Sequence, residues 1–467
     1  MHNLNVRLLF SISLVLGLCS CNKKFKDDDF KAYFGGEVSN PTNRYVLFCK
    51  DSEVIDTIPL NEDNTFFKTF DSLAPGLYSF KHEPEYQYVY FDKNDSLMVR
   101  INSQDFDESI IFCGRGEEKN NFMMELYLKN EDDKNKLFEV FDYDLPKFSN
   151  NIDSSYKSKE TFYNKKKEEL KWSEDFDKYA KASLDFFHYS KKEIYPIVHQ
   201  MRTGENIEDK LPKDYYDFRN NVDFNNAAFT NFSPFVRYLS NMMNNVATDK
   251  EFVNVSEIDK ALEVNIKKLN IADTLFKNEE IKNIVLNNIA FTYLLEDQNI
   301  VNNKKFLDKY HALSTDKDQH NEIVKIGNAI QSLKTGNDLP DVNLVDATGK
   351  VASIKSIIKK KTVIFFWTKN LESHLVAVHK KVLEFQRKHP DYDFVAISVD
   401  ENQDKWKASL ANYKFKGIKE YRAENFEDLK EKWVVNKIHR TILVDPNGKI
   451  DNAFVSLFDL KFEQHLK

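Results

Sequence analysis

The run TVIFFW at residues 362–367 constrains the fold more strongly than any other stretch of the chain. An unbroken apolar and β-branched run of this kind is typical of a strand that is buried on both faces. Apolar side chains then recur at helical spacing from Leu375 to Phe385, and FVAISV at residues 394–399 forms a second buried run. Residues 442–450 add a strand and the turn DPNG. This order of elements predicts an α/β domain with a mixed sheet over residues 335–467.

Two further regions precede this domain, and together the three predict a multidomain α+β protein. Residues 31–115 contain short aromatic and β-branched runs that are separated by turn signals, which favours a small β-sandwich or barrel. Residues 116–334 change to helical spacing, for example at Phe176, Ala180 and Leu184, and predict a helical region. The histidines of that region show no spacing typical of metal ligands: they are His188, His199 and His311.

The N-terminus has the features of a targeting signal. The apolar run from Leu8 to Leu18 is shorter than the about 20 residues that a membrane-spanning helix needs, and it fits the core of a signal peptide. The following LCSC at residues 18–21 resembles the lipobox of bacterial lipoproteins. That resemblance implies a signal peptide at residues 1–20, lipidation of Cys21 and a charged tether at residues 21–30.

The tether leaves one question open. Asn22 is not the aspartate that would favour retention at the inner membrane by analogy with lipoproteins. Lys26 and the aspartates at 27–29 resemble an export tag for the cell surface, but they equally fit a solvated linker. We therefore expect a lipid-anchored protein of the cell envelope, at the outer membrane, on either its periplasmic or its surface face.

Net charge and cysteine content indicate which ligands and which disulfide bonds can be expected. A net charge of −7 gives no indication of nucleic-acid binding, and we expect no cofactor. Of the four cysteines, only Cys49 and Cys113 remain after the signal and the lipid are accounted for. In an oxidising compartment they could form one disulfide, or both could be small buried hydrophobic residues.

The C-terminal motifs resemble the thioredoxin-like domains of envelope thiol–disulfide oxidoreductases, the TlpA and ResA-like group that grades into the peroxiredoxins. The matching segments are PD at 340–341 with Leu344 and GK at 349–350, FW at 366–367, AISVD at 396–400 with Trp406, and LVDPNGKI at 443–450. The resemblance implies a thioredoxin-like fold for residues 335–467.

The active-site positions depart from this family. Its two redox cysteines would fall at Leu371 and His374, and its cis-proline at His439. Leucine supplies no nucleophile, and histidine cannot form the disulfide that resolves the exchange. A peptide bond before a residue other than proline is trans at almost every position, so we expect a reshaped loop at His439. We therefore predict a binding module rather than an enzyme, with a protein or peptide partner in the envelope.

Alternatives to a pure binding role remain at this stage. His374 and His439, with Glu372 nearby, could hold a divalent metal. Cys49 and Cys113 could act as a dithiol, or a partner chain could supply the sulfur for a redox accessory. A hydrolase built on Ser373 has no visible orienting group.

Overall fold

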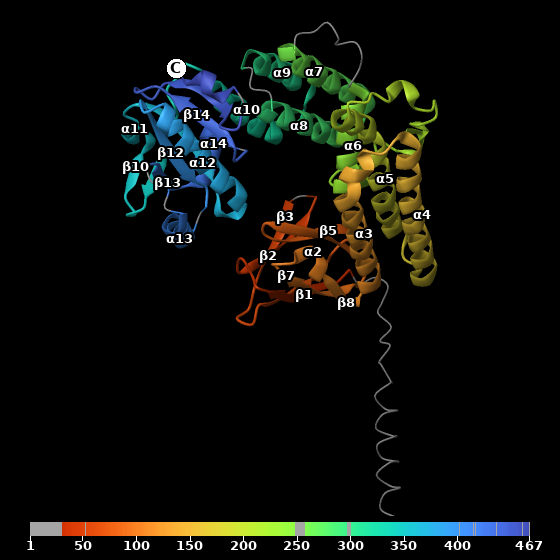
Figure 1. The fold of residues 1–467 in the computed structure, drawn as a ribbon. Helices are drawn as coiled ribbons and strands as arrows, with labels where there is room; N and C mark the ends of the chain where they lie inside the picture. Colours follow the sequence, from red (N-terminus) through yellow and green to blue (C-terminus); the bar gives the residue numbers. More distant parts are fainter. Residues whose placement is uncertain are drawn as a thin grey trace, which may run out of the picture. The chain divides into compact units, whose positions relative to one another are not determined.

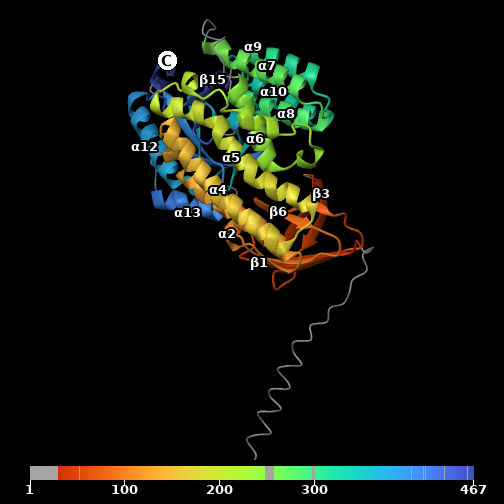
Figure 2. The same cartoon turned by 90° about the vertical axis from the view of Figure 1, so that its right-hand side faces the viewer.

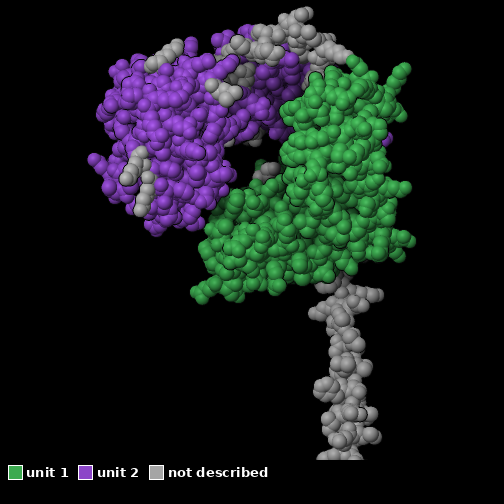
Figure 3. All heavy atoms as spheres, in the orientation of Figure 1, with its two compact units in different colours: residues 1–220, 231–238 green, residues 221–230, 239–467 purple. Residues whose placement is uncertain are grey.

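The computed structural model describes residues 30–466 apart from residues 52, 248–256, 297–299, 401, 414, 416, 436 and 460. The predicted signal peptide, the lipidation site Cys21 and the tether up to residue 29 lie outside the described residues. The chain divides into two compact units, which are coloured separately in Figure 3. Unit 1 contains the described residues of 1–220 and 231–238, and unit 2 contains those of 221–230 and 239–467.

Unit 1 begins with a β-sandwich of two four-stranded sheets, ordered β4-β1-β7-β8 and β3-β2-β5-β6 (Figure 1). Its strands are β1 (Ala32–Ser39), β2 (Tyr45–Lys50), β3 (Glu53–Pro59), β4 (Thr65–Phe70), β5 (Gly76–His82), β6 (Glu85–Phe91), β7 (Ser96–Asn102) and β8 (Ile111–Arg115), with the short helix α2 (Phe106–Ser109) before β8. Alternating side chains point inward and build an aromatic core between the sheets, where Phe34 contacts Phe48 and Phe80.

Three long helices form most of the rest of unit 1, and they lie side by side in Figure 1; Figure 2 shows α4 and α5 from another side. They are α3 (Glu117–Phe141), α4 (Leu145–Leu170) and α5 (Glu174–Thr203). Local sequence sets their ends: the Ser173 side chain accepts a hydrogen bond from the Phe176 N–H at the start of α5, and Gly204 ends it with φ +77°. Tyr90 of the sandwich packs among these helices, so the helices cover the outer face of the β3-β2-β5-β6 sheet.

Five further helices precede the C-terminal domain: α6 (Ser233–Ala247), α7 (Glu257–Leu275), α8 (Glu279–Glu296), α9 (Ile300–Leu313) and α10 (Lys317–Ser332). Helix α6 begins in unit 1, and the other four belong to unit 2. No helix among the described residues combines the length and apolar character needed to cross a membrane.

The C-terminal domain is a seven-stranded mixed sheet with strand order β10-β9-β13-β12-β11-β14-β15 and helices around it. The elements are β9 (Asn343–Asp346), β10 (Val351–Ser353), α11 (Ile354–Ile357), β11 (Lys361–Trp367), α12 (Glu372–Lys388), β12 (Tyr392–Ser398), α13 (Gln403–Tyr413), β13 (Lys419–Ala423), α14 (Phe426–Trp433), β14 (Arg440–Val444) and β15 (Ile450–Ser456). Strand β11 is central: it pairs parallel with β12 and antiparallel with β14, and the TVIFFW run is buried throughout. The predicted fold class is confirmed: a β domain, a helical middle region and a C-terminal α/β domain.

The helices predicted as one region over residues 116–334 are divided between the two units. Helices α3 to α5 pack with the β-sandwich, whereas α7 to α10 belong with the C-terminal domain. Apolar spacing gives the buried face of each helix but does not specify which other element covers that face.

Candidate functional site

The sheet brings the three predicted active-site positions to one edge. Strand β11 ends at Trp367 and leads through a short 3-10 turn (Lys369–Leu371) into α12. Strand β14 is antiparallel to β11, so its start at Arg440 lies at the edge where β11 ends. The first turn of α12 and the loop that precedes β14 therefore meet there, as the sequence predicted.

Leu371, His374 and His439 occupy this edge. Leu371 is the residue before α12, and 49% of it is exposed. His374 lies in the first turn of the helix, and His439 is exposed just before β14. The only cis peptide bond among the described residues joins Glu83 to Pro84, so the bond before His439 is trans.

The His374 side chain has an unusual environment. Neither ring nitrogen is solvent-accessible, and neither has a hydrogen-bond partner among the described residues. Burial, followed by the nearby imidazoles of His439 and His379, lowers the pKa of His374, so the ring is neutral at pH 7. The ring centroid lies 5.8 Å from that of Phe458, whose side chain is 45% exposed. We call Leu371, His374, His439 and Phe458 the His374 patch.

Asp400 fixes the turn that leads into α12. The Thr368 hydroxyl donates to its Oδ1 at 2.5 Å, and the Lys369 backbone N–H donates to its Oδ2 at 2.8 Å. At the helix start, the Tyr413 hydroxyl donates to the Glu372 carboxylate, and this bond raises the pKa of Tyr413. The backbone on either side of Leu371 is therefore held by Asp400, which follows β12, and by Tyr413 of α13.

A buried polar cluster lies beneath the patch. His379 is fully buried on α12, and its Nε2 lies 3.0 Å from Glu420 Oε1 of β13. The Trp367 indole N–H donates to the other carboxylate oxygen of Glu420 at 3.2 Å. Phe415 stacks on the His379 ring with centroids 4.0 Å apart. Because each polar atom of this cluster has a partner, we assign it to the support of β11 and α12.

The described residues provide no set of ligands for the metal site considered at His374 and His439. Among the described residues, no three His, Cys, Asp or Glu side chains are placed to hold one ion. Glu372, the predicted third ligand beside His374 and His439, is engaged by Tyr413.

The proposed pairing of Cys49 and Cys113 is not realised, because both thiols are free and they lie in different sheets of the sandwich. Cys49 is fully buried on β2, and burial raises the pKa of its thiol, which disfavours the reactive thiolate. Cys113 is exposed on β8, so the expectation that both cysteines could be buried is also wrong. An outward side chain on one sheet cannot reach a buried one on the other, and the pair therefore cannot act as a dithiol.

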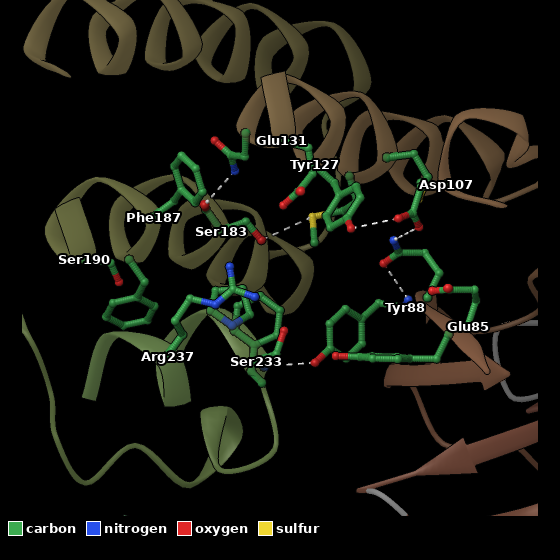
Figure 4. A pocket seen from close by; sticks show the side chains of 18 residues that line it. Glu85, Tyr88, Asp107, Tyr127, Glu131, Ser183, Phe187, Ser190, Ser233 and Arg237 are labelled. Atoms are coloured by element: carbon green, nitrogen blue, oxygen red, sulfur yellow. Dashed lines mark hydrogen bonds between the residues drawn. The ribbon is translucent and has the colours of Figure 1, made fainter. Parts of the chain in front are cut away.

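A cavity of about 230 Å³ lies within unit 1 (Figure 4), and no sequence motif indicates it. It is lined from β6, α2, α3, α5 and the start of α6, with aromatic walls that include Tyr88, Tyr127 and Phe187. Its residues are scattered from position 85 to position 237, so no local motif could have revealed it.

Three polar side chains of this cavity are joined by hydrogen bonds. Asp107 accepts hydrogen bonds from Tyr127 at 2.9 Å and from the Gln87 amide at 3.2 Å, so both of its oxygens are engaged. Burial and the bond to Asp107 raise the pKa of Tyr127, so its phenol stays neutral. Ser190 is 7% exposed, and its hydroxyl has no partner among the described residues.

Comparison with known proteins agrees with the C-terminal fold. A thioredoxin-like family model matches residues 359–450, which identifies this part of the chain as a thioredoxin-like domain. No curated protein is matched by the chain.

Solved structures that resemble the chain cover a little over a quarter of it. The thioredoxin domain of a thiol-disulfide oxidoreductase from Bacteroides vulgatus is 20% identical, with 29% of this chain and 99% of that chain covered and a TM-score of 0.25. A thiol:disulfide interchange protein from a Bacteroides species is 24% identical, with 26% and 80% covered and a TM-score of 0.24.

Proposed function

We propose that this chain is a lipid-anchored protein of the cell envelope whose thioredoxin-like domain binds a protein or peptide partner without exchanging thiols. One observation carries the proposal. Where a redox-active domain of this fold needs two cysteines, the chain has an exposed leucine and a histidine whose ring nitrogens lack partners. The supporting chemistry is that thiol exchange requires a thiolate and a resolving thiol, and no cysteine follows Cys113.

The His374 patch has properties that favour recognition of a peptide. Leu371, three residues before His374, and Phe458, whose ring centroid is 5.8 Å from that of His374, both expose apolar surface. No side chain caps the start of α12, so its first backbone N–H groups can donate to carbonyl or carboxylate groups of a ligand.

The N-terminal sequence supports a location in the cell envelope. The apolar run, the small residue and Cys21 are in the register of a lipobox, and the charged residues after Cys21 would hold the protein off the headgroups. We place the protein at the outer membrane, on either its periplasmic or its surface face.

Site-specific crosslinking in cells tests the binding role. A photoreactive amino acid replaces Ser373, which is exposed between Leu371 and His374, in an otherwise intact lipidated chain. We expect a discrete crosslinked partner that is lost when Leu371→Ser or Phe458→Ser is added.

Val376→Ser is the matched control, because Val376 is a 42% exposed apolar residue of the same helix but lies outside the patch. The crosslink should survive this change. A crosslink that is indifferent to all three substitutions, or the absence of any crosslink, would contradict a binding role for the His374 patch.

A further inference from the structure

The outer face of the β4-β1-β7-β8 sheet has an apolar centre, and the helical core of unit 1 packs on the other sheet of the sandwich. Strands of a sandwich normally place polar side chains on a face that meets water. Here Phe67, Gly35, Met98 and Cys113 are directly opposite one another across the four strands. The next row across these strands is polar: Glu37 is opposite Thr65 and Arg100, and the Arg100 guanidinium lies 3.7 Å from the Glu37 carboxylate. Tyr33 stacks on Phe67 with centroids 6.0 Å apart. We define the outer apolar face as Tyr33, Phe67, Met98, Ile111 and Cys113.

The outer apolar face is exposed, and its side chains pack against one another. Phe67 is 53% and Ile111 is 55% exposed. Gly35 has no side chain, and an added Cβ would lie 2.8 Å from the Phe67 ring and 2.9 Å from the Met98 sulfur, so these two side chains close over it. They border a shallow groove of about 520 Å³, which is also lined by Glu37, Thr65 and Arg100. The helices α3 and α5 instead cover the outer face of the other sheet through Tyr90.

The predicted lipid attachment lies close to this face along the chain. Phe30 is the first described residue and leads directly into β1, the strand that carries Tyr33 and Gly35. The Leu73 backbone N–H donates to the Phe30 carbonyl at 2.8 Å, which holds Phe30 beside the loop that follows β4. From position 21 to position 30 there are nine residue steps, which reach at most about 30 Å when fully extended. A lipid on Cys21 therefore keeps this sheet within about 30 Å of the bilayer surface.

We propose that the outer apolar face rests on the lipid bilayer, as a second and non-covalent membrane contact that orients unit 1. The proposal rests on the proposed lipid anchor at Cys21. The chemistry fits a membrane interface, because aromatic side chains such as Tyr33 and Phe67 favour the headgroup region. The lipid tether also raises the effective concentration of the bilayer surface near unit 1, so a small apolar face is sufficient for a membrane contact.

Cys113 allows a direct test, because it is the one exposed thiol expected in the mature chain. Cys19 leaves with the signal peptide, Cys21 carries the lipid, and Cys49 is buried. The lipidated full chain is labelled at Cys113 with a small fluorophore and bound to vesicles of phosphatidylethanolamine and phosphatidylglycerol. We expect quenching by a spin-labelled lipid and protection from aqueous iodide. A label at Lys165→Cys in a Cys113→Ser chain is the control, because Lys165 is an exposed residue of α4, and it should stay open to iodide.

Substitution of two exposed residues tests whether the outer apolar face causes this protection of Cys113. Phe67→Ser with Ile111→Ser should restore iodide quenching at Cys113, and should weaken vesicle binding of a non-lipidated Cys21→Ser chain about tenfold. Circular dichroism checks that the variant remains folded.

The outcomes separate this proposal from the lipid anchor. A chain that floats with the vesicles but leaves Cys113 open to iodide and untouched by the lipid quencher overturns the membrane contact and leaves the anchor intact. Protection from iodide without lipid quenching means that a protein or a second copy covers the face, which also overturns it. A chain that does not float overturns the anchor itself, together with the proposal that depends on it.

Discussion

The contact between His379 and Glu420 requires a shared proton. His379 Nδ1 lies 2.7 Å from the Leu375 carbonyl, which can only accept, so Nδ1 carries a hydrogen. Nε2 faces Glu420 at 3.0 Å, and a hydrogen bond there needs one further proton on either the imidazole or the carboxylate. Because the Trp367 N–H donates to the same carboxylate, Glu420 holds two elements of the site in place.

This arrangement predicts opposite results for two substitutions of Glu420. Glu420→Leu leaves the polar atoms of Trp367 and His379 without their partner, and we expect a loss of about 2–4 kcal/mol in the free energy of unfolding. Glu420→Gln can still accept from Trp367 and donate to a neutral His379, so a loss below about 1 kcal/mol is expected. Urea unfolding of the full chain, followed by tryptophan fluorescence, measures both. Equal losses would show that the shared contacts do not stabilise the domain.

Among the helices and strands, the sequence predicted those whose buried apolar residues lie close together along the chain. Strands β11 and β12 and helix α12 fall where the apolar runs and the helical spacing placed them. Strand β13 was not predicted, because KEYRA at residues 419–423 is mostly polar and only its last residue is buried. Sheet neighbours on both sides complete such a strand, and a single sequence does not contain that information.

The candidate site was also predicted only in part. The family pattern located Leu371, His374 and His439, and the sheet brought them to one edge. Phe458 and Glu420 were missed, because their contacts with α12 join residues 84 and 41 positions apart (458 minus 374, and 420 minus 379). The unit 1 cavity was missed for the same reason.

Helix α5 contains a histidine that makes unit 1 sensitive to acid. Burial, followed by Lys192, Lys191 and Lys159, lowers the pKa of His188 to about 3. The carboxylate of Asp153 at 3.5 Å does not offset this, because Asp153 is 63% exposed. The unfolded chain binds a proton at His188 below its ordinary pKa of about 6.5, whereas the folded chain does not, so stability falls as the pH falls through that value.

We expect this one residue to remove about 1.4 kcal/mol of stability between pH 7.5 and pH 5.5. His188→Gln cannot titrate, so its unfolding free energy should fall less over that interval by about the same amount. Urea unfolding at the two pH values measures the difference between the proteins. An identical pH dependence of wild type and variant would mean that His188 is protonated in the folded chain.

At the scale of the whole molecule, the chain has two units, with the sandwich in one and the thioredoxin-like domain in the other. The proposed tasks are divided in the same way. Unit 1 follows the proposed membrane anchor and carries the outer apolar face, while unit 2 carries the His374 patch.

The anchor makes a prediction for the full chain in cells. Cys21→Ser should abolish the labelling of the protein by a fatty acid, because the acylated thiol is gone, and should weaken its attachment to the membrane fraction, to which only the outer apolar face would still bind. Cys19→Ser is the control and should change neither result, since Cys19 precedes the expected cleavage. Continued labelling of the Cys21→Ser protein would place the lipid elsewhere or remove it from the account.

Reduction of a disulfide substrate tests whether the thioredoxin-like domain lacks thiol chemistry, as its proposed role in binding a partner requires. The rate of insulin reduction by dithiothreitol is compared for the wild type and for the chain with both Leu371→Cys and His374→Cys, which restores the family's cysteine spacing at the start of α12. We predict no acceleration by the wild type and a measurable acceleration by the double variant, because a helix N-terminus lowers a thiol pKa and a second thiol resolves the mixed disulfide. Acceleration by the wild type that is lost in a chain with Cys49→Ser and Cys113→Ser would contradict the account and assign this protein a redox role through unit 1.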